Sequence, residues 1–212
     1  QRSDKTFRLA CELVRNGRLG KIKRVTTYLP EGLRGGPFVE QPAPQELNWD
    51  FWQGQTMARS YVPERCHQKF RYWWDYSGGT VTDWGAHHND IALWGLGRDG
   101  SGPASVEGRA LVEPVPGGFT APNSYRIRYE YDDGVEHICQ STTANSWGGA
   151  VTGPPQEGER YHGVVFEGSE GWLYVSRDGK LEASDPDLLT TPLAADAQRL
   201  YVSDDHMANF FE

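Results

Sequence analysis

The sequence predicts a single α+β domain over residues 1–212, built on an open, predominantly antiparallel β-sheet with helices packed on one face. Two observations carry this prediction. Helical periodicity is confined to segments near the start and in the middle of the chain, whereas several segments of alternating polarity in the second half follow one another without an intervening helix. Consecutive strands of this kind pair antiparallel, and the helices then cover one face of the sheet.

The first half of the chain begins with a short helix. In "SDKTFRLACELVRNG" we expect Ser3 to be the N-cap, followed by an apolar helical face and a stop at Asn16-Gly17. The next segment, "KIKRVTTYL", predicts a strand. The proline-rich stretch 30–63 predicts a long surface loop, and such loops often carry functional residues.

The second half of the chain predicts paired strands. "SYRIRYEYDDGVEHICQST" alternates Tyr or Ile with charged residues, and Asp133-Gly134 predicts a tight turn into the second strand of a hairpin. "HGVVFEGSEGWLYVSRDGKLEAS" repeats the pattern with turns at 168–171 and 178–179. Its three short strands are expected about Val164, Leu173 and Leu181.

Composition excludes several classes of partner. The net charge of -8 argues against nucleic acid or an anionic membrane surface, because both require a basic face. Three distant cysteines predict neither a disulfide framework nor a metal site, and we expect buried or idle thiols. No apolar run approaches the roughly 20 residues of a membrane span, and "QRSDKTF" does not resemble a signal peptide. We expect a cytoplasmic location, with the periplasm as the alternative.

The central stretch "DYSGGTVTDWGAHHNDIALWGLG" places carboxylates and histidines in an otherwise apolar, helix-compatible run. If the helix starts at Val81, Asp83, His87, Asp90 and Trp94 share one narrow stripe, because a helix advances about 100° per residue. A solvated face is usually broad and rich in Lys and Glu, and this stripe has neither. We therefore expect these side chains to face a cavity.

Structural interpretations of the same residues remain open. Thr80 and Asp83 have the spacing of a capping box, so Asp83 has a plausible role as a helix cap. His88 points about 100° away from His87, and we expect it to be packed or hydrogen-bonded locally. We expect no metal, because Asp83 and His87 supply two ligands and no HxxxH or CxxC pattern adds the others.

Several segments, in order, resemble the C-terminal domain of the Gfo/Idh/MocA oxidoreductases. They are "GRLGKIKRV", "NWDFWQGQ", "FRYWWDYSGGTVTDWGAHHNDIALWGLG", "FEGSEGWLYV" and "DDHMANFFE". The most specific part is the pattern GG-x-x-x-D-x-x-x-H-x-x-D, formed by Gly78, Gly79, Asp83, His87 and Asp90. The "WDFW" segment resembles members that act on sugars or glycosides. The resemblance covers nearly the whole chain.

The resemblance implies a two-domain enzyme in which this chain holds the substrate and covers the nicotinamide ring. An N-terminal Rossmann domain would bind NAD or NADP and supply a catalytic lysine from a Glu-Lys-Pro motif. Neither feature is expected here, because the glycine-rich stretches lack the strand and helix that a dinucleotide site needs. We expect a fragment without cofactor-binding residues, inactive alone. Family members commonly pair through the sheet, so we expect a homo-oligomer through its outer face, where we place the Tyr/Ile strand.

The resemblance also assigns candidate site residues. Removing hydride from an alcohol requires its hydroxyl proton to leave, and a neutral imidazole suits that role near pH 7. His87 is the expected base, and Asp83 orients it or binds substrate. Asp90 is expected to support the site from behind. The candidates for a carbohydrate-like substrate, from composition and segment similarity, are Trp49, Trp52, Tyr61, Arg71, Trp74 and Asp90, with Tyr72 and Trp73 beside them.

Three functions follow from the sequence. The first is an NAD(P)-dependent oxidoreductase acting on a sugar, polyol or glycoside. The second is a glycoside hydrolase or lyase on the same scaffold, in which transient oxidation acidifies a neighbouring carbon and a leaving group is eliminated. The third is a non-catalytic binding or oligomerisation domain.

Overall fold

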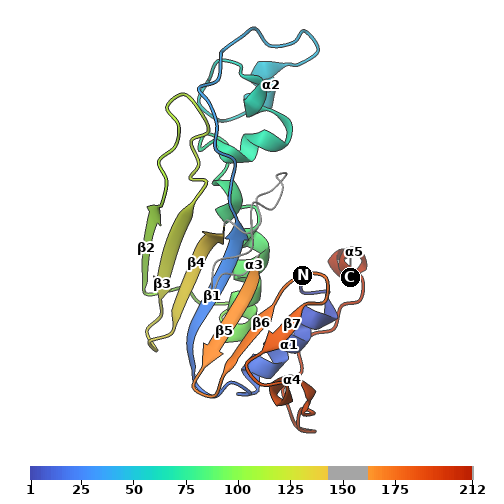
Figure 1. Cartoon of the computed structure of the whole chain (residues 1–212). Helices are drawn as coiled ribbons and strands as arrows, with labels where there is room; N and C mark the ends of the chain where they lie inside the picture. Colours follow the sequence, from blue (N-terminus) through green and yellow to red (C-terminus); the bar gives the residue numbers. More distant parts are fainter. Residues whose placement is uncertain (143–161, 212) are drawn as a thin grey trace.

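A computed structural model describes residues 1–142 and 162–211, which form one seven-stranded sheet with helices on one side (Figure 1). The helices are α1 (Lys5–Arg15), α2 (Trp49–Gln53), α3 (Gly85–Leu96), α4 (Asp187–Thr190) and α5 (His206–Phe211). Short 3-10 helices span η1 (Pro63–Arg65), η2 (His67–Tyr72) and η3 (Gly79–Val81). The strands are β1 (Ile22–Pro30), β2 (Ser105–Ala110), β3 (Tyr125–Glu130), β4 (Glu136–Thr142), β5 (Gly163–Gly168), β6 (Trp172–Val175) and β7 (Leu181–Ala183).

The sheet confirms the predicted fold class. Its order is β2-β3-β4-β1-β5-β6-β7, and every neighbouring pair is antiparallel except β1 and β4. The hairpin of β3 and β4 turns at Asp133-Gly134, where the Tyr131 N–H donates to the Val135 carbonyl over 3.1 Å. Among the described residues, no helix is long and apolar enough to cross a bilayer.

The main core lies between the sheet and two helices. Phe7 from α1 and Ile91 from α3 are fully buried against Val25, Phe166 and Leu173 of the central strands. Figure 1 shows α1 and α3 on the same side of the sheet. Residues 31–77, which we call the lobe, extend beyond one end of the sheet and carry α2 (Figure 1).

The N-cap of α1 is Asp4, which corrects the prediction of Ser3. Oδ1 of Asp4 accepts the backbone N–H groups of Thr6 at 2.7 Å and Phe7 at 3.4 Å, the second and third helical positions that a cap must reach. Oγ of Ser3 instead lies 3.0 Å from Oγ of Ser203. The predicted stop is confirmed, because the helix ends at Arg15.

The central helix begins later than predicted, at Gly85 rather than Val81. Local bonds compete with the helical ladder before that point, because Oγ1 of Thr82 donates to the Gly79 carbonyl and accepts the Gly78 N–H. Asp83 therefore precedes α3. The α3 terminus has no side-chain cap, which removes the capping-box interpretation.

The outer face of the sheet combines charged side chains with the apolar side chains of Ile138, Val165 and Tyr174. The Tyr/Ile strand does not contribute its apolar side chains to this face, which corrects its predicted placement. Tyr125 and Ile127 pack on the helix side with Trp84, and Arg128 projects from the other face. There the Glu136 carboxylate accepts hydrogen bonds from Arg24 at 2.6 Å and from Arg128 at 2.5 Å.

Candidate functional site

His87 lies in the first turn of α3 with an exposed side chain, so it does not face an enclosed cavity among the described residues. Partial burial and the nearby Arg177 guanidinium lower the pKa of His87, whereas Asp83 and Asp90 raise it. The net direction is downward. His87 is therefore neutral at pH 7, the form that accepts a proton.

Asp83 and Arg71 meet beside this turn. Nε of Arg71, from η2, lies 3.4 Å from Oδ2 of Asp83, and their side chains are 21% and 33% exposed. The fold thus places Arg71 of the lobe next to Asp83, just before α3, and Asp83 close enough to His87 to affect its pKa. All three are residues that the sequence singles out. Among the described residues no hydrogen bond joins Asp83 to His87, so Asp83 affects the pKa of His87 only through the electrostatic field of its charge.

Asp90 is committed to an ion pair. Its two carboxylate oxygens accept hydrogen bonds from Nε and Nη2 of Arg2 at 2.8 and 2.7 Å. The same guanidinium lies 5.2 Å from the centre of the Trp94 ring and pairs with Asp99. This bidentate pairing fits a supporting role for Asp90 better than direct contact with a substrate.

The predicted aromatic residues divide between two places. Near α2, Trp49 and Trp52 stack with ring centres 4.9 Å apart, and Tyr61 meets Trp49 edge-on at 5.3 Å. Trp52 borders a cavity of about 590 Å³. This cavity is also lined by Gln53, Gly54, Gln55, Thr56, His67, Phe70 and Tyr76.

Trp74 belongs to a different hollow at the base of the lobe. It is 61% exposed and borders an apolar cavity of about 320 Å³ with Val81, Pro122, Tyr125 and Ile127. The neighbouring aromatic residues Tyr72 and Trp73 are 2% and 3% exposed and pack in a core cluster.

The sequence did not indicate two residues that lie near this turn, His162 and Arg177. His88 is fully buried, as expected, but its partner is His162, whose Nδ1 lies 3.2 Å from Nε2 of His88. Arg177 lies 4.5 Å above the Trp84 ring. The contacts with His162 and Arg177 join distant parts of the chain, so no local spacing could have indicated them.

No metal centre is present in the described parts of the chain, where no group of three His, Cys, Asp or Glu side chains can hold an ion. The three cysteines are buried and free, as the sequence predicts. Burial raises the pKa of the Cys139 thiol to about 12 and that of Cys11 further. Neither thiol is a nucleophile at pH 7.

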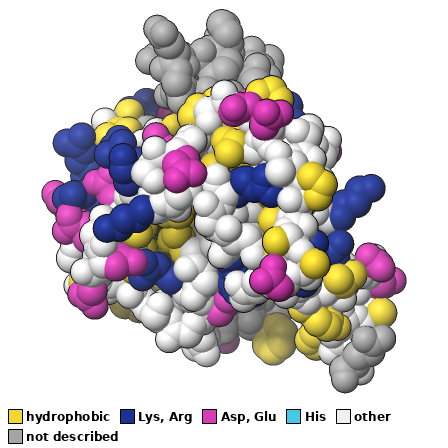
Figure 2. Space-filling view, turned by 90° about the horizontal axis from the view of Figure 1, so that it is seen from below, with side chains coloured by type: hydrophobic (Ala, Val, Ile, Leu, Met, Phe, Trp, Pro, Cys, Tyr) yellow, Lys and Arg dark blue, Asp and Glu magenta, His cyan; other side chains and the backbone are white. Residues whose placement is uncertain are grey.

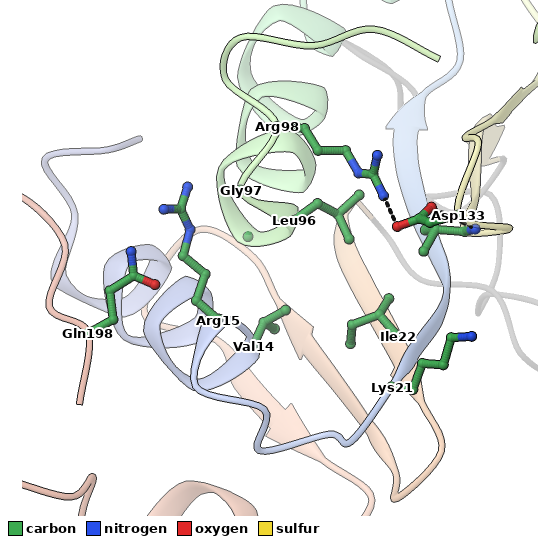
Figure 3. Close-up of a pocket in the computed structure, with 11 residues that line it drawn as sticks. Val14, Arg15, Lys21, Ile22, Leu96, Gly97, Arg98, Asp133 and Gln198 are labelled. Carbon is green, nitrogen blue, oxygen red and sulfur yellow. Dashed lines mark hydrogen bonds and ion pairs between the residues drawn. The ribbon is translucent and has the colours of Figure 1, made fainter. Parts of the chain in front are cut away.

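A cavity of about 480 Å³ lies at the C-terminal ends of α1 and α3 (Figure 3). Val14, Ile22 and Leu96 line it, and Nη2 of Arg98 bonds Oδ2 of Asp133 at its edge over 2.5 Å. It contains none of the predicted site residues. Figure 2 views this end of the molecule and shows acidic and basic side chains interspersed.

Comparison with known proteins gives one family and a set of similar folds. The family model described as "Oxidoreductase family, C-terminal alpha/beta domain", of Gfo/Idh/MocA type, matches residues 34–169. No curated protein matches the chain.

Three solved structures illustrate the similarity. An oxidoreductase from Thermotoga maritima is 15% identical with a TM-score of 0.52, covering 99% of this chain and 48% of that one. Another solved structure, of a putative oxidoreductase from the same organism, is 17% identical with a TM-score of 0.51, covering 88% of this chain and 44% of that one. The WlbA dehydrogenase from Bordetella pertussis, solved with NADH and UDP-GlcNAcA, is 17% identical with a TM-score of 0.48, covering 89% and 46%. The chain thus spans less than half the length of each.

Proposed function

Because the chain belongs to the Gfo/Idh/MocA oxidoreductase family, as its C-terminal alpha/beta domain, we propose that it is the substrate-binding part of an NAD(P)-dependent oxidoreductase acting on a sugar, polyol or glycoside. One observation carries the proposal. The neutral His87 stands exposed in the first turn of α3, with the Asp83–Arg71 pair beside it. A neutral imidazole that is open to solvent can accept the proton that an alcohol releases.

The described residues do not fit the phosphates of NAD or NADP. Such phosphates bind backbone N–H groups where a helix starts after a strand and a glycine turn. The string "GLGRDG" at 95–100 has the glycine spacing, but it lies at the C-terminal end of α3, where carbonyl groups rather than N–H groups point outward. We propose that residues outside this chain hold the cofactor, which when bound takes a hydride from a substrate carbon.

The residues of this chain handle the proton. As the carbon loses hydride, the hydroxyl proton moves to the neutral imidazole of His87 and the C–O bond becomes a carbonyl. The negative charge of Asp83 stabilises the imidazolium that forms. Arg71, whose Nε lies 3.4 Å from Oδ2 of Asp83, orients that carboxylate through their ion pair. The exposure of His87 lets it return the proton to solvent.

The lobe supports the assignment of a carbohydrate-like substrate. Stacked indole rings give flat apolar faces of the kind that pack on sugar rings, and the cavity beside Trp52 adds amide and hydroxyl groups. We propose that Trp52 and Trp74 contact different parts of an extended substrate, since they border different cavities.

The experiment follows two products at once. A longer protein that carries this chain and a dinucleotide-binding domain is incubated with sugars and aryl glycosides, while NADH absorbance and released aglycone are recorded. Net reduction of NAD or NADP without aglycone supports the oxidoreductase. Aglycone release without a net absorbance change supports the hydrolase or lyase instead. Absence of both contradicts an enzymatic role and favours the binding-domain alternative.

Self-association through the outer face of the sheet remains part of the proposal. The charged part of this face, where Arg24 and Arg128 flank Glu136, can pair with a second copy through complementary charges. Light scattering of the chain at low and high salt tests it. We expect a dimer that weakens as salt rises, and a monomer at every concentration and salt contradicts the proposal.

A further inference from the structure

Two imidazoles, one buried and one half-buried, meet at the first turn of α3. The His88 side chain is fully buried, and its Nε2 lies 3.2 Å from Nδ1 of His162, with the rings stacked at 5.3 Å and 19°. His162 is fixed in turn, because its carbonyl accepts hydrogen bonds from Oη of Tyr174 at 2.7 Å and Oγ of Ser176 at 2.8 Å. The pair therefore ties α3 to strand β6 and the residue that follows it.

Contacts through Trp84 link this pair to His87. The backbone N–H groups of His87 and His88 both donate to the Trp84 carbonyl over 3.1 Å. The Trp84 ring in turn contacts both imidazoles, with ring centres 5.8 Å from His88 and 4.9 Å from His162. We therefore expect a shift of the His88 ring to disturb the first turn of α3 and the position of the His87 side chain.

We propose that His88 is a positioning residue for His87 and that it acts through its hydrogen bond to His162. The proposal adds to the function proposed above, on which the role of His87 rests. The contact itself does not depend on that function, because it is present in the structure irrespective of what His87 does.

The pair holds its geometry while both rings are neutral. Only one of the two facing nitrogens can carry a hydrogen, so a doubly protonated pair would place two N–H groups against each other. Burial is the main cause that lowers the pKa of both His88 and His162. The surrounding charges are mostly positive and add to this effect. They are Arg177, Lys180 and the amino group of Gln1, joined by His87 when it is protonated, with Asp178 as the acidic exception.

The test compares two replacements of His88 by NMR of the chain. His88→Phe fills the buried space but removes the hydrogen bond to His162, whereas His88→Gln keeps a side-chain N–H donor near the position of Nε2. His137→Gln is the matched control, because His137 is an equally buried imidazole in a different place, bonded to Thr27. The readouts are the ring titration of His87 and the amide exchange of residues 84–88.

We expect His88→Phe to raise the pKa of His87 toward the ordinary value of about 6.5, because a loosened turn relieves its partial burial. Amide exchange at 84–88 should rise at least about 10-fold. His88→Gln should retain most of both wild-type values, and His137→Gln should change neither. If His88→Phe folds and leaves both readouts unchanged, the proposal is wrong, and the same holds if His88→Gln behaves like His88→Phe.

His162→Phe gives a second approach if His88→Phe does not fold. It removes the same hydrogen bond from the other side and should raise the pKa of His87 in the same direction. No turnover is measured in these experiments. Their failure would leave the proposed oxidoreductase function standing, and failure of that function would leave this coupling intact.

Discussion

The buried imidazole of His137 predicts a pH-dependent loss of stability that can be assigned to one residue. His137 lies on β4 and is 3% exposed, and its Nε2 lies 2.8 Å from Oγ1 of Thr27 on the adjacent strand β1. Burial lowers its pKa from 6.5 to about 4. Replacing His137 by a residue that does not titrate should remove its share of the pH dependence of stability.

Stability falls with falling pH because the unfolded chain takes up the proton at a higher pH than the folded chain does. The unfolded chain binds it near pH 6.5 and the folded chain only near pH 4, so this stability is fully present above about pH 6.5 and is lost as the pH falls toward 4. With that difference in pKa, the folded state loses about 2 kcal/mol between pH 7 and pH 5.

Urea unfolding of the wild type and of His137→Gln, each at pH 7 and pH 5, measures this loss. Glutamine keeps an N–H donor for Thr27 but does not titrate. The other histidines are the same in both proteins, so their contributions cancel in the comparison. We expect the variant to lose about 2 kcal/mol less than the wild type between the two pH values. Equal losses would refute the reasoning.

Three further substitutions test a close packing contact, a helix cap and an ion pair. Gly95→Ala should cost about 1–3 kcal/mol in urea unfolding, because a Cβ there would lie 2.6 Å from ring carbons of the buried Phe166. Asp4→Ala should cost about 1 kcal/mol in thermal unfolding as the true cap of α1, and Ser3→Ala clearly less. Asp75→Ala removes a carboxylate that pairs with two arginines at 2.8 Å, so it should cost about 1–3 kcal/mol and speed proteolysis within the lobe.

Sequence patterns predicted the elements that have one buried and one solvated face. The alternation before Asp133-Gly134 indicated the hairpin because Tyr125 and Ile127 pack toward the helices while Arg126 and its alternating neighbours face outward. The periodicity of α1 was equally clear, because its apolar face lies in the core.

Sequence patterns did not predict the elements that lack one buried and one solvated face. Strand β2 is the edge of the sheet, its side chains are almost all exposed, and Gly108 interrupts it, so no alternation marks it. The parallel pairing of β1 with β4 and the bond between His88 and His162 depend on contacts between distant parts of the chain. At the candidate site the sequence indicated Asp83 and His87, but not that Arg71 would pair with Asp83.

The most direct test of the central claim is the turnover of His87→Ala in a longer protein that carries this chain and a dinucleotide-binding domain, measured beside its melting temperature. Loss of a general base should lower turnover about 10²–10⁴-fold while the melting temperature stays within a few degrees, because the His87 side chain is exposed. Asp83→Asn, which removes the charge but little volume, should lower turnover in the same direction. Turnover of His87→Ala close to that of the wild type would contradict the assignment of His87 as the proton acceptor.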